Sequence, residues 1–372
     1  MIAFAKDVLQ TVFRMLPWPT EPGLRAIGNP GRRSPVLLTA NYDLTVRRVE
    51  RALRGLDAWL LVAPAKGINV WCAAAGGHLT THQVVSALRT SGIAERVDHR
   101  ELVLPQLAAT GVEGLDVHRR AHWRVRFGPV RAEDLPAYLA AGGEKTDAMR
   151  RVAFGPRDRL EMAVAWGAPS ALVVGGAALA LRPAWALPLA ALCAALSLAT
   201  FTLLDRIPAR APLALGAAAT AVAVALVAAA GGGAGALAAA LAAPPLLTAL
   251  LTFDYAGSTP LEGGSHFDSR SWKIELDTER CAGIFRCWEV CPEACFERDD
   301  AARKAVLAHD ERCVRCGACV VQCPKDALYF IDGEGDRIAP ETIRRFKLNL
   351  LGRRTVGTPG GEGAEGDRRA PH

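Results

Sequence analysis

The middle of the chain is nearly free of charged residues, and this feature limits most strongly what the chain can fold into. Four apolar segments follow one another there, and each is close to the roughly 20 residues that a helix needs to span a bilayer. Many of their residues are alanine and glycine, which allow helices to pack closely. We therefore predict an α-helical transmembrane bundle within residues 160–252, with an alanine-rich bundle buried in a soluble protein as the alternative. The segments are residues 162–181, 185–204, 213–230 and 234–251.

Arginines beside these segments predict how the chain would lie in a membrane. Several arginines precede the first segment, and Arg206 and Arg210 lie between the second and the third. The connection between the first and second segments holds only Arg182, and the connection between the third and fourth holds no charged residue. Positively charged residues favour the cytoplasmic side, so both termini are expected there. The predicted localisation is the cell inner membrane, with membrane lipid around a multi-pass segment and both soluble parts in the cytoplasm.

Composition argues against two classes of protein. The net charge of the 372 residues is only +6 and the basic residues are scattered, so we expect no nucleic acid as a partner. Seven of the ten cysteines lie in tight motifs near the C-terminus. Such spacing is typical of metal ligands in a reducing compartment and argues against a disulfide framework.

The first part of the chain, residues 1–155, has the pattern of an α/β domain. An amphipathic helix is expected near the N-terminus, where apolar residues recur at helical spacing without the continuous apolar core of a signal peptide. Short apolar runs then alternate with helical segments, which predicts a Rossmann-like fold with a parallel sheet and ligand loops at the carboxyl ends of its strands. The expected strands include residues 36–39 and 59–63, and the expected helices are 44–53, with Asp43 as N-cap, and 80–89, capped near Thr80.

Cys72 follows the strand expected over residues 59–63 and lies at or near the start of a helix. The positive end of a helix dipole lowers the pKa of a thiol and favours the thiolate. The small residues from Ala73 to Gly77 leave the thiol uncrowded, so a wide, flat ligand could approach it. The alternative is that Cys72 is a small buried apolar residue, as free cysteines commonly are.

Residues around Cys72 allow a functional and a structural interpretation. Asn69 could hydrogen-bond the loop or position the thiolate, and Trp71 could contact a ligand or pack. His78 and His82, expected one turn apart on one helix, could bind metal or face water, and His78 is the competitor of Cys72 as the ligand of a bound metal. The residues after the first strand could contact a ligand or serve in capping: Asn41, Asp43 and Thr45.

Residues 69–74, Asn-Val-Trp-Cys-Ala-Ala, resemble the cap-helix signature of the corrinoid proteins of microbial mercury methylation, the HgcA family. The resemblance implies a corrinoid-binding domain in which Cys72 is the lower axial ligand of the cobalt and the catalytic residue. Asn69, Trp71 and Ala73 would then lie at the cofactor. Ala75 and Gly76 depart from the family, which usually has glycine and lysine at these places. The resemblance also covers residues 34–48, 55–63, 99–112 and 127–136.

The C-terminal part carries the spacing Cys-x2-Cys-x2-Cys-x3-Cys-Pro over residues 313–324, which is typical of bacterial 4Fe–4S ferredoxins. An earlier half-motif, residues 281–292, has the spacing Cys-x5-Cys-x3-Cys-Pro, with Ile284 where a further cysteine would stand. Together the two halves resemble a two-cluster ferredoxin of the HgcB type. Residues 272–335 are therefore expected to form an α+β iron–sulfur domain.

In such ferredoxins the fourth cysteine of each motif binds the other cluster. The resemblance therefore implies one complete ligand set, for a [4Fe-4S] cluster, and one incomplete set. The incomplete set would hold a 3Fe–4S cluster, a 4Fe–4S cluster with a non-cysteine ligand, or no cluster if the half-motif has decayed. Cys295 could supply the missing thiolate or be a neighbouring thiol. The complete set is Cys291, Cys313, Cys316 and Cys319, and the incomplete set is Cys281, Cys287 and Cys323.

The combined resemblance implies a membrane-anchored fusion of a corrinoid methyl carrier with its own reductase. It implies a methyl donor of folate type, a low-potential electron donor and Hg(II) as the acceptor. The tail, residues 354–372, is expected to be disordered. It lacks the cysteine pair that typically ends the ferredoxin of the family, so a paralogue with another acceptor is an alternative. Two further alternatives are a membrane-bound iron–sulfur electron-transfer protein without methyl transfer and a corrinoid sensor or store.

Overall fold

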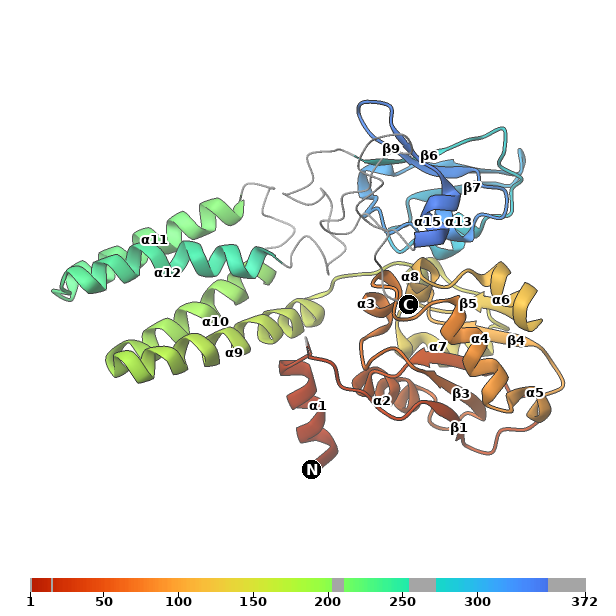
Figure 1. The fold of residues 1–372 in the computed structure, drawn as a ribbon, viewed down its shortest axis with the longest axis horizontal. Helices are drawn as coiled ribbons and strands as arrows, with labels where there is room; N and C mark the ends of the chain where they lie inside the picture. Colours follow the sequence, from red (N-terminus) through yellow and green to blue (C-terminus); the bar gives the residue numbers. More distant parts are fainter. Residues whose placement is uncertain (1, 15, 203–210, 254–271, 347–372) are drawn as a thin grey trace. The chain divides into compact units, whose positions relative to one another are not determined.

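The computed structural model describes residues 2–14, 16–202, 211–253 and 272–346 (Figure 1). The chain divides into two compact units, of which the first comprises residues 1–16 and 153–259 and the second residues 17–152 and 260–372. The N-terminal helix α1 (Ile2–Val12), which we expected in the α/β domain, belongs to the first unit, where Arg14 forms an ion pair with Glu161. The tail expected to be disordered lies outside the described residues.

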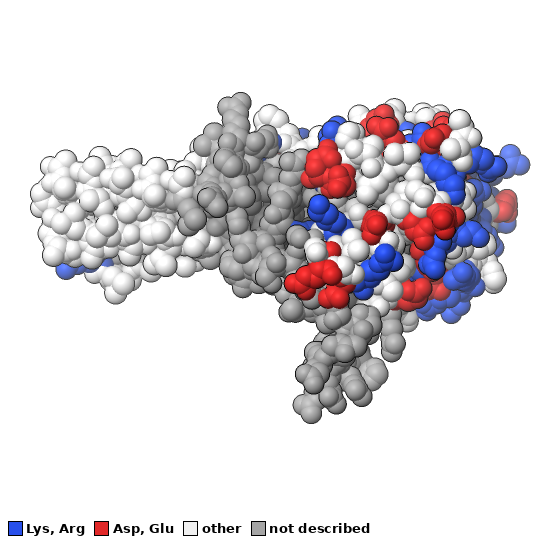
Figure 2. All heavy atoms as spheres, turned by 90° about the horizontal axis from the view of Figure 1, so that it is seen from above, with Lys and Arg blue, Asp and Glu red and all other residues white. Residues whose placement is uncertain are grey.

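The first unit contains the helices of the apolar middle. Small residues let its first two long helices approach closely: a Cβ on Gly167 would lie 3.0 Å from Cβ of Ser197, and the Ser197 hydroxyl donates to Ala163 O at 2.8 Å. Figure 2 shows hardly any charged side chain on the described parts of these helices. The helices are α9 (Pro156–Leu181), η3 (Pro183–Trp185), α10 (Ala186–Thr202), α11 (Ala211–Ala229) and α12 (Ala234–Phe253).

Two stretches of the described chain, Pro156–Leu181 and Pro183–Thr202, have the length and apolar composition of a helix that crosses a membrane. The apolar helical stretches Ala214–Ala229 and Ala234–Ala249 are shorter. Length and composition thus support two of the four expected spans. Because two such helices also occur in soluble proteins and signal sequences, the transmembrane bundle stays a prediction.

The second unit is built on a five-stranded sheet in the order β1-β3-β2-β4-β5. Neighbours pair in parallel except for β1, which is antiparallel to β3, so the sheet is mixed and our prediction of a parallel sheet holds only for its other strands. Every residue of β2 and β3 is buried, because the chain covers both faces of the sheet and forms a separate apolar cluster on each. The strands are β1 (Gly23–Ile27), β2 (Val36–Ala40), β3 (Ala58–Ala63), β4 (Glu101–Leu104) and β5 (Arg124–Phe127).

Helices connect these strands, and their starts show which capping predictions were right. The helix predicted from Thr80 is confirmed, since Thr80 and Gln83 form a capping box. Asp43 is not an N-cap: it is the first residue of its helix and pairs with Arg47 at 2.9 Å. The helices are α2 (Asp43–Ala52), α3 (Val70–Ala75), α4 (Thr81–Thr90), α5 (Ile93–Arg96), η1 (Gln106–Thr110), α6 (Gly114–Ala121), η2 (Ala132–Asp134), α7 (Leu135–Ala140) and α8 (Asp147–Arg150).

The C-terminal part of the second unit is a small α+β domain. It contains a three-stranded sheet in the order β10-β9-β6 and the hairpin β7-β8, and a short helix follows each cysteine loop. Its elements are β6 (Lys273–Leu276), α13 (Arg286–Val290), β7 (Phe296–Asp299), β8 (Lys304–Leu307), η4 (Asp310–Arg312), α14 (Ala318–Gln322), β9 (Leu328–Ile331), β10 (Arg337–Ile338) and α15 (Pro340–Phe346).

Candidate functional site

The loop between β3 and α3 is held to the end of the neighbouring strand β2. Asn41, the residue after β2, accepts hydrogen bonds on its Oδ1 from Ala65 N (2.7 Å) and Gly67 N (3.0 Å). Gly67 has φ of 68°, and a Cβ there would lie 2.4 Å from Pro19 N. Neither the conformation nor the space suits a larger residue. Asn41, which we considered as a ligand contact or a cap, therefore fixes the loop that leads to Cys72.

Cys72 is the third residue of the six-residue helix α3, which is a separate helix from α4. Asn69 is the N-cap of α3 and accepts from Cys72 N at 2.9 Å, while its Nδ2 donates to Cys72 Sγ at 3.4 Å. Cys72 is half-buried. Both roles considered for Asn69, holding the loop and positioning the sulfur, are thus combined in one side chain. The low pKa of this thiol stays a prediction.

The neighbours of Cys72 lie in different surroundings. Trp71 is partly buried against the apolar cluster on one face of the sheet. Ala73 is completely buried in that cluster, and its carbonyl oxygen accepts from His78 N (2.7 Å) and Leu79 N (2.9 Å). The Ala73 methyl group has no exposed surface, so it packs α3 against the core. A role of Ala73 at a cofactor would therefore not be a direct contact of its side chain.

The two histidines do not share a helix, contrary to our expectation. His78 lies in the turn between α3 and α4, whereas His82 is an exposed residue in the first turn of α4. Burial and the nearby charge of Lys66 lower the pKa of His78, which favours the neutral imidazole. The structure therefore does not present these two rings as a pair.

A tight contact joins α3 to η1. A Cβ on Gly111, the residue after η1, would lie 2.5 Å from both Ala74 O and Leu79 O. This contact couples the backbone around Cys72 to the segment that follows β4.

We expect Gly111→Ala to lower the free energy of unfolding of the second unit by about 1–3 kcal/mol, because the new methyl group must push α3 and the following turn away. Thermal or chemical unfolding of the purified chain measures this effect. Gly31→Ala is the matched control, since a Cβ on Gly31 meets no atom within 4 Å. Equal stability of the two variants would show that the α3–η1 contact is loose in solution.

The C-terminal cysteines form two groups. A cavity is lined by Cys291, Cys313, Cys316 and Cys319, which we call the complete site, and also by Cys295. Cys287 is buried in the apolar cluster of this domain, and Cys281 and Cys323 pack against the same cluster; we call these three the incomplete site. The structure thus brings the four cysteines of the complete site together across the two motifs, while the grouping of the other three and the role of all seven as ligands stay predictions.

The chemistry of the complete site fits an iron–sulfur cluster. Burial raises the pKa of Cys316 and Cys319, so without metal these thiols keep their protons. Cys291 Sγ accepts from the backbone N–H of Cys295 at 3.3 Å, and Cys313 Sγ from that of Arg315 at 3.4 Å. Four converging sulfurs with backbone donors are what a cluster requires, since such hydrogen bonds tune bound thiolates.

The incomplete site shares part of this pattern. Ala305 N donates to Cys281 Sγ at 3.5 Å, and Ala327 N donates to Cys323 Sγ at 3.4 Å. Ile284, which stands where a further cysteine would be expected, is 48% exposed. The position that would supply a further thiolate thus carries a half-exposed apolar side chain.

Cys295 belongs to the complete site. It is 2% exposed and lines the same cavity as Cys291 and Cys313, and the interaction with its thiol lowers the pKa of both. The alternative that Cys295 supplies the missing thiolate of the incomplete site by refolding of the loop stays a prediction.

We expect Cys295→Ala to retain the iron content of the wild type, since four other cysteines already converge on the complete site. Iron analysis and EPR of the reduced protein measure this outcome. Cys319→Ala is the control and should lose the signal of the complete site. A loss of iron in Cys295→Ala comparable to that control would make Cys295 a ligand.

Comparisons with known proteins match two parts of the chain. Residues 9–139 match the family described as CO dehydrogenase/acetyl-CoA synthase delta subunit. Residues 308–329 match the 4Fe-4S binding domain. The first match contains α3 with Cys72, and the second contains the uninterrupted cysteine motif.

Similar proteins include gamma subunits of the acetyl-CoA decarbonylase/synthase complex. The subunit of Archaeoglobus fulgidus is 38% identical over 125 residues, which are 33% of this chain and 26% of the relative. That of Methanopyrus kandleri is 39% identical over 129 residues, 34% of this chain and 28% of the relative. Gamma subunit 2 of Methanosarcina mazei is 40% identical over 117 residues, 30% of this chain and 24% of the relative.

The chain therefore spans about a quarter of the length of these relatives. The HgcA family, with which we compared residues 69–74, falls within the same broad family. Residues 9–139 are thus similar to the CO dehydrogenase/acetyl-CoA synthase delta-subunit family, and residues 308–329 to a 4Fe-4S binding domain of the ferredoxin type.

Proposed function

We propose that the chain is a corrinoid-dependent methyl-transfer protein whose C-terminal domain supplies electrons to the cofactor of the α/β domain. The observation that carries this proposal is the presentation of Cys72. Its half-buried thiol is held by Asn69 on a loop fixed at the carboxyl edge of the sheet, where ligands of α/β domains bind. The similarity of residues 9–139 to subunits of the acetyl-CoA decarbonylase/synthase complex supports it.

The residues around Cys72 suit a corrinoid. Cys72 would be the lower ligand of the cobalt, and Asn69 Nδ2 would orient its sulfur. Ala75, Gly76 and Gly77 follow and offer little steric hindrance to a flat ring. A bound corrinoid supplies the metal that carries a methyl group, for which protein side chains have no equivalent. As a thiolate, Cys72 would supply electron density to this metal.

We propose a folate-type methyl donor and a soft electrophile of the Hg(II) type as acceptor. Gly76 stands where mercury-methylation proteins usually have lysine, and the space around it is tight. A Cβ on Gly76 would lie 2.8 Å from Cys72 O. A lysine at this place would therefore displace the backbone that carries Cys72. The changed surroundings of the cofactor make a related acceptor the second candidate.

The complete site is proposed to hold a [4Fe-4S] cluster, which transfers single electrons. The incomplete site would hold a 3Fe–4S cluster or a 4Fe–4S cluster with a non-cysteine ligand. The helices α9 to α12 would anchor the chain in the inner membrane, with both soluble domains in the cytoplasm. A low-potential protein would serve as external electron donor.

Anaerobic reconstitution of the detergent-solubilised chain with a corrinoid tests the proposal. Stoichiometric cobalt, together with methyl transfer from methyltetrahydrofolate to Hg(II) when a low-potential reductant supplies two electrons per methyl group, is the expected result. Absence of cobalt from a protein with intact iron–sulfur signals would overturn it. The chain would then be an iron–sulfur electron-transfer protein, the alternative that the ferredoxin-type motif favours. Stoichiometric cobalt without turnover would indicate a sensor or store.

A further inference from the structure

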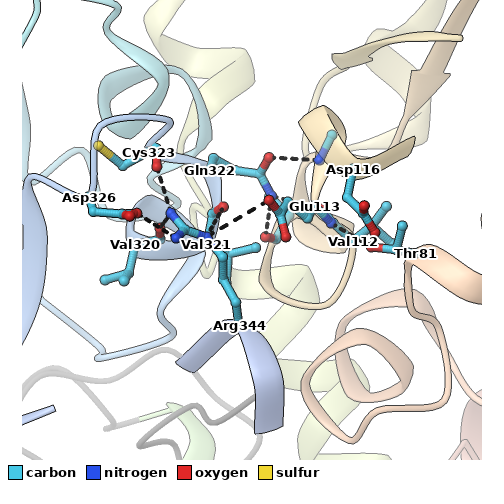
Figure 3. A network of polar contacts seen from close by, with 12 residues as sticks. Thr81, Val112, Glu113, Asp116, Val320, Val321, Gln322, Cys323, Asp326 and Arg344 are labelled. Atoms are coloured by element: carbon cyan, nitrogen blue, oxygen red, sulfur yellow. Dashed lines mark hydrogen bonds and ion pairs between the residues drawn. The ribbon is translucent and has the colours of Figure 1, made fainter. Parts of the chain in front are cut away.

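Two buried glutamines connect the α/β domain and the iron–sulfur domain within the second unit. Gln322 lies at the end of α14, directly before Cys323, and is 9% exposed. Its Nε2 donates to Ala109 O (2.8 Å) and to Val112 O (2.7 Å), and its Oε1 accepts from Gly114 N at 3.1 Å. Figure 3 shows this side chain reaching from the iron–sulfur domain to the segment around Val112 and Glu113. The side chain thus uses both of its polar atoms on the backbone of the other domain.

Gln106 makes the reciprocal contact from η1 and is 1% exposed. Its Nε2 donates to Arg150 O at 2.7 Å and reaches Cys291 O at 3.4 Å. Its Oε1 accepts from Lys145 Nζ at 2.8 Å, and the same ammonium donates to Glu289 O at 2.9 Å. The amide of Gln106 therefore joins backbone of the α/β domain to a cysteine of the complete site.

Charged and aromatic groups surround these contacts. The Arg150 guanidinium lies 3.6 Å from the ring centroid of Trp288 and donates to Trp288 O at 2.9 Å. Arg344 forms an ion pair with Asp326 and a longer one, at 3.9 Å, with Glu113 (Figure 3). Arg150 makes its contacts as a buried residue, while Arg344 is partly exposed.

The apolar centre of the interface is continuous with the core of the α/β domain. Cys316 and Val314 belong to the same buried cluster as Ala109 and Val112. Linked domains usually move relative to each other unless their interface is large and apolar. A shared apolar core with buried amide contacts on both sides is the exception that favours a fixed arrangement.

We infer that Gln106 and Gln322 are positioning residues that hold the complete site in one fixed place against the α3–η1 region that carries Cys72. Each amide finds its partners only in this arrangement, and a shift would leave buried donors and acceptors unpaired. Gly111, packed on Ala74 O, continues the contact from η1 to α3. The inference rests on the proposed function, since fixed spacing matters when electrons pass between the two sites.

Hydrogen exchange of the full chain with reconstituted clusters tests this without a corrinoid. We expect Gln322→Glu, a variant of equal size, to lower the protection of the amides between Ala109 and Gly114 at least tenfold. The carboxylate lacks the two N–H donors and places a negative charge beside two carbonyl oxygens. Lys325→Gln is the control. Lys325 is exposed in the turn that follows α14, so the protection of the same amides should match that of the wild type.

A second variant covers the case in which Gln322→Glu loses iron, because Gln322 adjoins Cys323. Gln106→Met acts from the other domain and should lower the protection of the amides of α13 and α14 at least tenfold. Iron content at the wild-type level must accompany the change. Unaltered protection in both variants, or a wild type whose Ala109–Gly114 amides exchange freely, would overturn the inference.

Pulsed EPR on protein that has bound cobalt adds a readout that packing alone would not change. The wild type should show one narrow distribution of distances between Co(II) and the reduced cluster, and Gln322→Glu a broad one. A broad distribution in the wild type would contradict the fixed arrangement. Failure to bind cobalt would contradict the proposed function instead, while the exchange experiment would still decide whether the two domains are fixed.

Discussion

Cys72→Ala is expected to change the visible and Co(II) EPR spectra of the corrinoid-loaded chain and to lower methyl transfer about 100-fold or more. The Cys72 thiolate would be the only protein ligand that α3 offers to the metal. Even mutation of a residue that hydrogen-bonds a metal ligand commonly lowers metal affinity or activity about 10- to 100-fold. Asn69→Ala should produce a smaller loss, about tenfold, because Asn69 Nδ2 orients the sulfur but does not replace it. The measurements are cobalt per chain, the two spectra and the rate of a single methyl transfer.

Cys193→Ala serves as the control for the loss of a thiol. Cys193 is completely buried in α10, in the other unit, and takes no part in the proposed chemistry. It should leave cobalt content and spectra unaltered. Cobalt with an identical spectrum in Cys72→Ala and wild type would remove Cys72 as the ligand. Attention would then pass to His78, whose lowered pKa leaves a neutral ring able to bind metal.

Local patterns predicted the elements that depend on local interactions. The helix from Thr80 was correctly predicted because its capping box lies within four residues of sequence. The convergence of Cys313, Cys316 and Cys319 could be anticipated because one loop places their sulfurs within a few residues of one another, whereas the addition of Cys291 was implied by the resemblance to two-cluster ferredoxins. Strands β2 and β3 were expected from their continuous apolar runs, which suit strands buried on both faces.

Other features depend on distant partners and escaped prediction. Strand β1 is a short, partly exposed edge strand containing Arg25, and it is specified by its antiparallel pairing with β3. The separate helix α3 is set by the Asn69 cap and by Asn41, which fixes the loop before it from another strand. The partners of Gln322 are more than 200 residues away in sequence. A single glutamine next to a predicted ligand cysteine carries no local sign of such contacts.

Cys316→Ser is the second change with a large expected effect, and it should remove the cluster of the complete site. The predicted ligand is only 8% exposed and belongs to the buried cluster that the two domains share. Serine would leave a hydroxyl in an apolar place and one iron without its thiolate. We expect about four iron atoms fewer per chain, loss of the corresponding EPR signal, and a Tm lower by about 10 °C or more, because bound metal stabilises only the folded domain.

Cys281→Ser distinguishes the two sites. Cys281 belongs to the incomplete site and packs against the apolar cluster of the iron–sulfur domain, not against the one shared with the α/β domain. Its loss should spare the signal of the complete site and the protection of the amides after η1. In Cys316→Ser the amides between Ala109 and Gly114 should lose protection when the iron–sulfur cluster is lost. The reason is that Val314 and Cys316 pack in the same apolar core as Ala109 and Val112. If cluster loss left their exchange unaltered, the α/β domain would be independent of the iron–sulfur site. A path for electrons between the two would then need another contact.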